Sequence, residues 1–367
     1  MTRPELPALS TTGRLDAVRA ALADAGCDAM VVTGPTDIRW CSGFTGSNGA
    51  LVITTGAAVL LTDSRYREQA TLELAEAGCD ADVVITNALV AGGAEWLAGA
   101  ARVALDEVSV SWADQRAWAD AVAADIVPTT DLVMVLRSRK DEAELARIRR
   151  AATIVDGVLA DCLPLLRAGI TERQLALAID DGMRVRGASG PAYETIVAAG
   201  PNAALPHARP TDRPFATGDL VVIDAGALVD GYRSDMTRTF VLGDPDPRAE
   251  EILGVVTDAQ ARGVAAVAPG VTTGQVDEVC RSFIADAGFG DAFGHGTGHG
   301  VGLDIHELPA VRRDGPAILQ PGHVITVEPG VYLPGFGGVR VEDCLVVTAE
   351  GCESLTRSPK DPVVHVA

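Results

Sequence analysis

Residues 218–226 read GDLVVIDAG, and residues 322–330 read GHVITVEPG. Each stretch is a glycine turn, a mostly β-branched run that predicts a buried strand, and a carboxylate where that strand ends. The second copy begins 104 residues after the first, counted from Gly218 to Gly322. We therefore expect two similar units in the C-terminal part of the chain, with Asp224 and Glu328 at equivalent strand ends.

A second pair of matching segments supports the duplication. Residues 169–175 read GITERQL, and residues 270–276 read GVTTGQV, an offset of 101 from 169 to 270. In both segments a Thr followed three residues later by Gln predicts a capping box that opens an amphipathic helix. Two matches in the same order at nearly the same offset favour two α+β halves that face each other, with a site between them.

Each strand-end carboxylate is followed by a second one. Asp235 comes 11 residues after Asp224, and Glu342 comes 14 residues after Glu328, inside the strand-like run 339–347. Both spacings suit a hairpin return that brings the second acid beside the first. Four convergent carboxylates repel one another and are costly to bury without a cation. Two divalent metal ions bridged by carboxylates would remove this cost.

Residues 294–307, GHGTGHGVGLDIHE, hold three of the six histidines of the chain: His295, His299 and His306. A flexible surface loop with chance histidines is one interpretation. The other is that one imidazole completes the set of four carboxylates, which would suit Mn, Co, Fe or Zn. Two metals about 3.5–4 Å apart would hold a bridging water as hydroxide near neutral pH, so the pattern predicts a hydrolase.

The first 135 residues predict a separate α/β domain with a mostly parallel or mixed sheet, because helical and strand-like segments alternate there. The strand-like runs 50–54 and 57–62 flank Gly56 and predict a hairpin. Residues 138–166 predict a long amphipathic helix broken near Pro164. The boundary is therefore expected near residue 135, which gives domains 1–135 and 136–367.

Composition limits the partners and the compartment. The 367 residues carry a net charge of −20, which argues against nucleic acid or an anionic membrane as a partner. The seven cysteines are scattered and form no CxxC motif, which favours a reducing, cytoplasmic location. The N-terminus has no apolar signal region and no run approaches 18 apolar residues, so neither a signal peptide nor a membrane span is expected.

Together the motifs resemble the pita-bread metallopeptidases of the creatinase, prolidase and aminopeptidase P group, most closely the bacterial Xaa-Pro dipeptidases (prolidases) and Xaa-Pro aminopeptidases. SGFTGSNG and LTDSRYREQA are similar to the N-terminal domain of this group. The resemblance implies five ligands for two divalent metal ions, manganese first, with cobalt, zinc or iron as alternatives. They are Asp224 in VVIDAGA, Asp235 in YRSDMTRTF, His299 in HGTGHGVGL, Glu328 in TVEPGVY and Glu342 in VRVEDCLVV.

The resemblance also implies how these residues divide the work. Asp235 and Glu342 would bridge both metals. Asp224 would serve one metal, and His299 with Glu328 would serve the other. Glu328 would also take part in proton transfer from the nucleophilic water.

Four further residues match positions that the group uses around the metals. His207 in ALPHARP and His306 in LDIHE would hold the substrate or the tetrahedral intermediate, and His295 would line the pocket and assist proton transfer. Arg340 lies two residues before Glu342 and would act near the site or orient a ligand carboxylate. His323 and His365 lie outside the motifs and are expected to be structural or exposed.

The implied activity is hydrolysis of the Xaa-Pro bond in dipeptides or short peptides through a metal-bridging hydroxide. The substrate would be a proline-containing di- or oligopeptide, and the protein a homodimer. An Xaa-Pro aminopeptidase that acts on longer peptides is the alternative within the group. A non-catalytic peptide-binding protein on the same fold is the alternative of a different class, and the intact ligand set disfavours it.

Overall fold

The computed structural model describes residues 6–361 and the backbone of residues 363–364, so His365 lies outside the described residues. The chain divides into two compact units, Met1–Arg137 and Ser138–Ala367, called here the N-terminal and C-terminal units. Among the described residues, no helix combines the length and the apolar character needed to cross a membrane.

The N-terminal unit is built on one six-stranded sheet in the order β4-β3-β2-β1-β5-β6. The central pairs β1–β2 and β2–β3 are antiparallel and the outer pairs are parallel, so the prediction of a mixed sheet is confirmed, as is the predicted hairpin between β2 and β3. Its strands are β1 (Ala29–Val32), β2 (Gly49–Thr54), β3 (Ala58–Thr62), β4 (Asp82–Ile85), β5 (Arg102–Asp106) and β6 (Asp125–Thr129). Its helices are α1 (Arg14–Asp24), α2 (Pro35–Ser42), α3 (Arg67–Ala77), α4 (Leu89–Trp96), α5 (Trp112–Ala121) and α6 (Leu132–Arg137).

The C-terminal unit begins with a helix shorter than the sequence suggests. The predicted helix 138–166 begins too early, because α7 spans Glu142–Cys162, but the predicted break near Pro164 is confirmed. Asp141 caps it through a capping box with Glu144. The residues before the cap pair elsewhere, since Lys140 N–H donates to the Gly322 carbonyl at 2.8 Å. Pro164 lies in the short 3₁₀ turn Leu163–Leu165 that follows α7.

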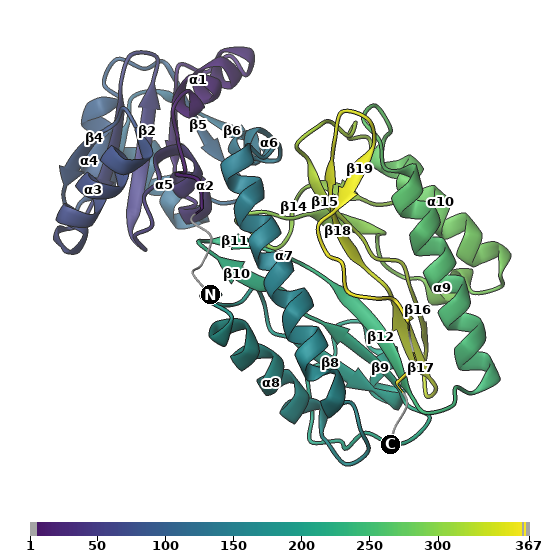
Figure 1. The fold of residues 1–367 in the computed structure, drawn as a ribbon. Helices are drawn as coiled ribbons and strands as arrows, with labels where there is room; N and C mark the ends of the chain where they lie inside the picture. The colour runs from purple at the N-terminus through teal and green to yellow at the C-terminus, as the bar shows by residue number, and fades with distance from the viewer. Residues whose placement is uncertain (1–5, 362, 365–367) are drawn as a thin grey trace. The chain divides into compact units, whose positions relative to one another are not determined.

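The two halves of this unit repeat the same arrangement of elements. Three antiparallel strands lie in the order β8-β9-β12 in the first half and β13-β15-β18 in the second. Figure 1 shows α7 and α8 along one flank of the strands, and α9 and α10 along the other. Both predicted capping boxes are present, at Thr171 of α8 and Thr272 of α10. The prediction of a duplicated α+β domain is therefore confirmed.

The bounds of these elements follow. The repeated strands are β8 (Ile196–Ala199), β9 (Leu220–Asp224), β12 (Thr237–Leu242), β13 (Gly298–Gly300), β15 (Val324–Val327) and β18 (Asp343–Val347). The helices after α7 are α8 (Glu172–Val185), α9 (Pro247–Ala266) and α10 (Thr273–Asp286). The shorter strands are β7 (Gly190–Pro191), β10 (Ala227–Val229), β11 (Tyr232–Arg233), β14 (Glu307–Val311), β16 (Gly330–Leu333), β17 (Gly337–Arg340), β19 (Cys352–Ser354) and β20 (Val363–Val364).

The halves meet where β12 runs beside the segment that joins β17 to β18. Glu342 N–H donates to the Thr237 carbonyl at 3.1 Å, and Thr239 Oγ1 donates to the Arg340 carbonyl at 2.8 Å. The predicted continuous strand 339–347 is therefore wrong, since Val341 and Glu342 lie between two strands. Glu342 uses its backbone N–H to join the halves, and this leaves its side chain free to enter the space between them.

His323 is a structural residue of this unit, one of the two roles expected for it. Its side chain is buried, with 7% of the residue exposed. Nδ1 accepts a hydrogen bond from Gln320 N–H at 3.2 Å, and Nε2 lies 3.4 Å from Ser138 Oγ. Burial and the positive charges of Lys140 and Arg139 lower the pKa of His323 to about 4. The imidazole is thus held neutral, with Nδ1 as an acceptor.

We expect His323→Asn to reduce the loss of stability between pH 7 and pH 5. An unfolded histidine has a pKa of about 6.5. Between pH 6.5 and pH 4 the His323 imidazole binds a proton in the unfolded chain but not in the folded chain. The free energy of unfolding therefore falls as the pH falls. Asn retains an acceptor for Gln320 without titrating. The wild type should lose on the order of 1 kcal/mol more than the variant.

Urea unfolding followed by far-UV circular dichroism measures this difference. Tryptophan fluorescence would report the wrong unit, because all four tryptophans lie within residues 1–137. Equal losses of stability in the wild type and the variant would contradict the assignment.

Candidate active site

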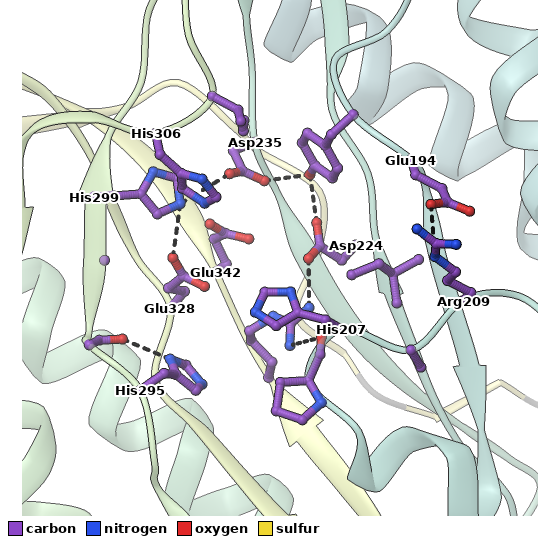
Figure 2. Close-up of a pocket in the computed structure, with 18 residues that line it drawn as sticks. Glu194, His207, Arg209, Asp224, Asp235, His295, His299, His306, Glu328 and Glu342 are labelled. Carbon is purple, nitrogen blue, oxygen red and sulfur yellow. Dashed lines mark hydrogen bonds and ion pairs between the residues drawn. The ribbon is translucent and has the colours of Figure 1, made fainter. Parts of the chain in front are cut away.

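A cavity of about 480 Å³ opens between the two halves of the C-terminal unit. It is lined by every residue for which the sequence predicted a role in metal binding or catalysis, as Figure 2 shows for most of them. These residues are His207, Asp224, Asp235, His295, His299, His306, Glu328, Arg340 and Glu342. The structure therefore brings together side chains that span 136 sequence positions, from 207 to 342.

The predicted ligands come from equivalent places in the two halves. Asp224 ends β9 and Glu328 directly follows β15. Asp235 lies two residues before β12, and Glu342 lies immediately before β18. Because β9 pairs antiparallel with β12, and β15 with β18, the end of the first strand lies beside the start of the second in each pair. The duplicated unit thus delivers two acids from each half, and β13 adds His299.

Three of the five predicted ligands form a tight group. One ligand atom from each of Asp235, His299 and Glu342 lies within 4.8 Å of the others. Glu328 Oε1 lies 3.2 Å from His299 Nε2 on one side of this group. Asp224 lies on the other side, joined to Asp235 through the hydroxyl of Tyr193. Figure 2 shows Asp235 and Glu342 between His299 with Glu328 and Asp224.

His299 is oriented so that Nε2 faces the acids. Its Nδ1 lies 3.0 Å from the carbonyl oxygen of Gly300, to which it donates. Nε2 then points toward Glu328 Oε1 and, at 3.5 Å, toward Asp235 Oδ2. Burial lowers the pKa of His299, but the hydrogen bond to Glu328 and the nearby charges raise it to about 9. A proton or a metal ion on Nε2 satisfies this geometry, whereas a bare lone pair facing two carboxylates does not.

The carboxylates at the centre have fewer protein donors than they need. Tyr193 has a single hydroxyl hydrogen, yet its oxygen lies within hydrogen-bond distance of both Asp224 and Asp235. Glu342 Oε2 accepts from Thr237 Oγ1 at 2.7 Å, but its Oε1 is buried and has no hydrogen-bond partner among the described residues. Burial and the charge of Asp224 raise the pKa of Asp235 to about 8. This donor set fits divalent cations.

Arg340 is the buried cation that faces Asp224. Its Nη2 donates to Asp224 Oδ2 at 2.6 Å, its Nη1 donates to Tyr332 Oη at 2.8 Å, and its Nε donates to Thr237 Oγ1 at 3.1 Å. The guanidinium therefore fixes the carboxylate of Asp224 directly. It also fixes Thr237, whose hydroxyl donates a hydrogen bond to Glu342.

His295 has both ring nitrogens engaged by protein atoms. Nδ1 lies 2.7 Å from the Gly296 carbonyl, and Nε2 lies 3.0 Å from Tyr332 Oη. Because Arg340 donates to the Tyr332 oxygen, the Tyr332 hydroxyl hydrogen is free to donate to His295 Nε2. In this arrangement His295 presents no free nitrogen to the cavity.

The other two predicted histidines are exposed in the cavity. His306 packs its ring edge-on against the ring of His299, with centroids 4.3 Å apart. Figure 2 shows His207 below Asp224 in this view, on the opposite side of the cavity from His299. His207 follows Pro206 on the segment between the 3₁₀ turn Gly200–Ala204 and β9. Both side chains can therefore reach a molecule bound over the carboxylates.

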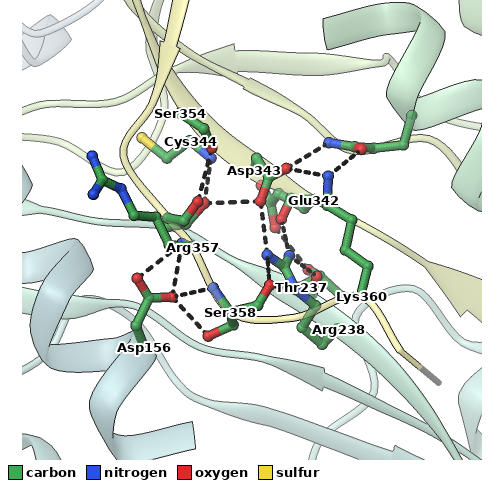
Figure 3. A network of polar contacts seen from close by, with 12 residues as sticks. Asp156, Thr237, Arg238, Glu342, Asp343, Cys344, Ser354, Arg357, Ser358 and Lys360 are labelled. Atoms are coloured by element: carbon green, nitrogen blue, oxygen red, sulfur yellow. Dashed lines mark hydrogen bonds and ion pairs between the residues drawn. The ribbon is translucent and has the colours of Figure 1, made fainter. Parts of the chain in front are cut away.

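A network behind the site holds the ligand-bearing strands together (Figure 3). Arg238 is 1% exposed and donates to the Glu342 carbonyl, to Asp343 Oδ1 at 2.8 Å and to the Ser358 carbonyl at 2.7 Å. Lys360 Nζ contacts Asp343 Oδ2 at 2.6 Å. Burial raises the pKa of Asp343, but Arg238 and Lys360 outweigh it and lower that pKa. The segment around Ser358 thus ties β12 to β18 directly behind Glu342.

The sequence reading missed the hydroxyl side chains that position the acids. They are Tyr193, Thr237, Thr326 and Tyr332. Two of them carry a weak signal, because Thr326 lies two residues before Glu328 and Thr237 two residues after Asp235, a spacing that puts strand neighbours on one face. Tyr193 carries none, since its partners Asp224 and Asp235 are distant in sequence. Tyr332 lies only eight residues from Arg340, across the β16–β17 hairpin, but its other partner, His295, is distant.

Comparisons with known proteins match both units. Residues 146–349 match Metallopeptidase family M24, and residues 14–139 match the Creatinase/Prolidase N-terminal domain. The chain is 40% identical to the Xaa-Pro dipeptidase of Pyrococcus horikoshii over 231 residues, which are 63% of this chain and 66% of that protein.

Solved structures are similar over almost the whole chain. The Xaa-Pro dipeptidase from Bacillus anthracis gives a TM-score of 0.93 at 34% identity and covers 97% of this chain and 100% of that one. The X-Pro aminopeptidase from Thermotoga maritima gives 0.83 at 34% identity and covers 94% and 100%. The predicted fold class, a creatinase/prolidase-type N-terminal domain followed by a pita-bread domain, is confirmed.

We expect Glu342→Gln to stabilise the metal-free protein and to destabilise the metal-loaded protein. Burial and the charge of Asp235 raise the pKa of Glu342 well above its usual value. Above pH 4.5 this raised pKa makes folding less favourable without a cation, and a neutral amide removes the penalty. The gain without metal should be on the order of 1–3 kcal/mol at pH 8 and should shrink as the pH falls.

Thermal unfolding of the wild type and the variant, measured with a chelator and again with added Mn²⁺, tests both the expected gain and the expected loss of stability. The exposed Glu350 provides the control, because Glu350→Gln should change stability by less than about 0.5 kcal/mol in either condition. A Glu342→Gln variant that is destabilised to the same extent with and without metal would show that the carboxylate is not a cation ligand.

Proposed function

The chain is a metallopeptidase that belongs to family M24, and from this premise we propose that it hydrolyses the Xaa-Pro bond of dipeptides and short peptides. The observation that carries the proposal is the convergence of four carboxylates and His299 in one cavity, with a buried Glu342 oxygen that has no partner among the described residues. Such a set needs cations, and metal-assisted hydrolysis is the chemistry that two cations in a peptide-sized cavity support.

Two divalent ions would be held by the five residues in two overlapping groups. The central position of Asp235 and Glu342 supports a bridging role for both carboxylates. Asp224 would complete the ligand set of one ion, and His299 with Glu328 would complete that of the other. These residues lie on opposite sides of Asp235 and Glu342. Oxygen ligands with one imidazole suit manganese first, and cobalt, zinc or iron as alternatives.

When bound, the two ions supply the Lewis acidity that makes a water molecule nucleophilic near neutral pH and polarises the scissile carbonyl. Glu328 would take the proton of that water; it lines the cavity, and its Oε1 lies beside His299 and accepts from Thr326 Oγ1 at 3.0 Å. His306 and His207 face the cavity and would donate hydrogen bonds to the substrate as negative charge develops on it.

His295 takes a different role in this proposal from the one that the resemblance implies. Its two nitrogens are engaged by Gly296 and Tyr332, so it would hold Tyr332 against Arg340 and thereby orient Asp224. Arg340 would then position a ligand carboxylate without contacting the substrate.

The cavity also has a wall that suits a proline ring. Ile196, Pro206 and Ala208 line it, and Ile196 lies opposite Asp224 in the pairing of β8 with β9. A peptide bond before proline has no N–H to donate, so the site cannot recognise it through that group and must bind the ring by shape. This wall belongs to the first half of the unit, opposite the half that carries His299 and Glu328.

Homodimer formation and a cytoplasmic location complete the proposal. Both rest on the resemblance, and the second is supported by seven cysteines that are all unpaired in the structure.

We expect removal of metal to abolish hydrolysis of an Xaa-Pro dipeptide and added Mn²⁺ to restore it. Asp235→Ala should lower kcat/KM by more than the roughly 10–100-fold that changes around a metal site usually cause, because both ions would lose a bridging ligand. Metal content per chain, measured by mass spectrometry, should fall in parallel. Asp244→Ala, an exposed acid beyond the end of β12, is the control and should keep full activity. Near-normal activity of the Asp235 variant would refute the ligand assignment.

We expect a higher kcat/KM for an Xaa-Pro dipeptide than for the matching Xaa-Pro-Yaa tripeptide. The comparison separates the proposed dipeptidase from an Xaa-Pro aminopeptidase, the second candidate, which the similarity to the Thermotoga maritima structure supports. Faster hydrolysis of the tripeptide would favour the aminopeptidase. Binding of either peptide to metal-loaded protein without hydrolysis would favour a peptide-binding protein.

A further inference from the structure

His306 lies on the loop 301–306, which joins β13 to β14 and is called here the His306 loop. Its side chain lines the cavity and packs edge-on against His299, with ring centroids 4.3 Å apart (Figure 2). The residue itself is exposed, so burial does not fix its position. A side chain that must meet a bound molecule in one place therefore needs a loop whose backbone is fixed by other contacts.

The His306 loop is organised around the carboxylate of the next residue, Glu307. Glu307 Oε1 accepts a hydrogen bond from Asp304 N–H at 2.9 Å, which closes the loop over the carboxylate. Gly302 lies so near that a Cβ at this position would be 2.5 Å from Glu307 Oε2. The Gly302 carbonyl also accepts from Arg233 N–H at 2.9 Å. The backbone on both sides of the turn is thus held against Glu307 and β11.

Glu307 is held in turn by a buried ion pair. Lys140 Nζ donates to Glu307 Oε2 at 2.8 Å, and the two side chains are each 1% exposed. Lys140 Nζ also donates to the Ser138 carbonyl at 3.2 Å. Because a charge buried this deeply is costly without its partner, the ammonium and the carboxylate fix each other in place.

The backbone of Lys140 is fixed beside the strand that leads to a candidate metal ligand. Lys140 N–H donates to the Gly322 carbonyl at 2.8 Å, and Arg139 forms an antiparallel bridge with His323. Residues 322 and 323 lead directly into β15, and Glu328 follows that strand. The ion pair therefore connects the His306 loop to the segment that places Glu328.

We propose that Lys140 is a positioning residue, which through Glu307 fixes the His306 loop and so sets where the His306 imidazole meets the substrate. Lys140 does not line the cavity, so it acts only through other residues. The inference rests on the proposed function, in which His306 donates a hydrogen bond as negative charge develops on the substrate. Such a contact is strongest in the transition state, so its loss lowers kcat and leaves KM nearly unchanged.

The main test is the double variant Lys140→Met/Glu307→Gln. Lys140→Met alone would leave a buried carboxylate unpaired and destabilise the fold, whereas Gln at position 307 removes that charge and keeps an oxygen for Asp304 N–H. The double variant should keep the wild-type metal content per chain, measured by mass spectrometry. Its kcat for an Xaa-Pro dipeptide should fall by roughly 10–100-fold, with KM within about twofold of the wild type.

A His306→Ala background separates positioning of this histidine from a general structural role. When His306 is already absent, the double change should lower kcat by less than about twofold, because the two effects share one cause. A crystal structure of the double variant gives a readout that needs no activity. It should show the His306 ring displaced from its contact with His299.

Arg149→Met is the matched control. Arg149 lies on α7 and its Nη2 pairs with Glu353 Oε2 of β19 at 2.9 Å, and neither residue belongs to the His306 loop or lines the cavity. This variant also loses one cation of an ion pair, and it should match the wild type in kcat, KM and metal content.

Four outcomes would overturn the proposal. The double variant would keep the wild-type kcat, or lose its metal, or lose as much kcat in the His306→Ala background, or keep the His306 ring in place. Failure of the underlying function looks different. The wild type would then not hydrolyse the dipeptide, and the His306 ring would still be displaced in the crystal structure of the double variant.

Discussion

Four carboxylates converge between the halves of the C-terminal unit, and the protein supplies fewer positive charges than they carry. Arg340 neutralises Asp224, and a protonated His299 can neutralise Glu328. Asp235 and Glu342 remain, and burial raises the pKa of both. A buried charge without a partner costs several kcal/mol, so these two acids decide where cations must bind. The other features of the site either hold the acids in place or give a substrate access to them.

The duplicated unit explains how acids so far apart in sequence meet. In each half an antiparallel pair of strands carries one acid at the end of the first strand and another just before the second. Arg238 then fixes β12 of one half to β18 of the other. The copies differ where β8 and β13 occupy equivalent positions, since β13 contributes His299 and β8 contributes Ile196. One half therefore adds the imidazole to the candidate ligand set, and the other adds an apolar side chain to the cavity wall.

Much of this arrangement could be predicted because its signals are local. A capping box needs only Thr171 and Gln174, and a strand-end carboxylate such as Asp224 follows directly from the strand before it. The wrong and missing predictions concern features that depend on contacts between residues far apart in the sequence. The run 339–347 is apolar and β-branched enough to predict one strand, but a hydrogen bond from Glu342 to Thr237, 105 residues away, divides it. Tyr193 and Arg340 act on Asp224 through packing of distant segments, which periodicity cannot show.

Catalysis and substrate selectivity depend on different parts of the chain, and only the first carries local sequence motifs. Metal ions activate water and polarise a carbonyl without distinguishing proline from any other residue. A bond before proline offers no N–H, so selectivity must come from the shape of the ring and the charge at the end of the chain. In the proposed function the ring would meet the wall of Ile196, Pro206 and Ala208, which lies on segments outside the ligand motifs. Chains with identical ligand motifs can therefore differ in substrate, and the length of peptide that a chain accepts has to be sought on this wall.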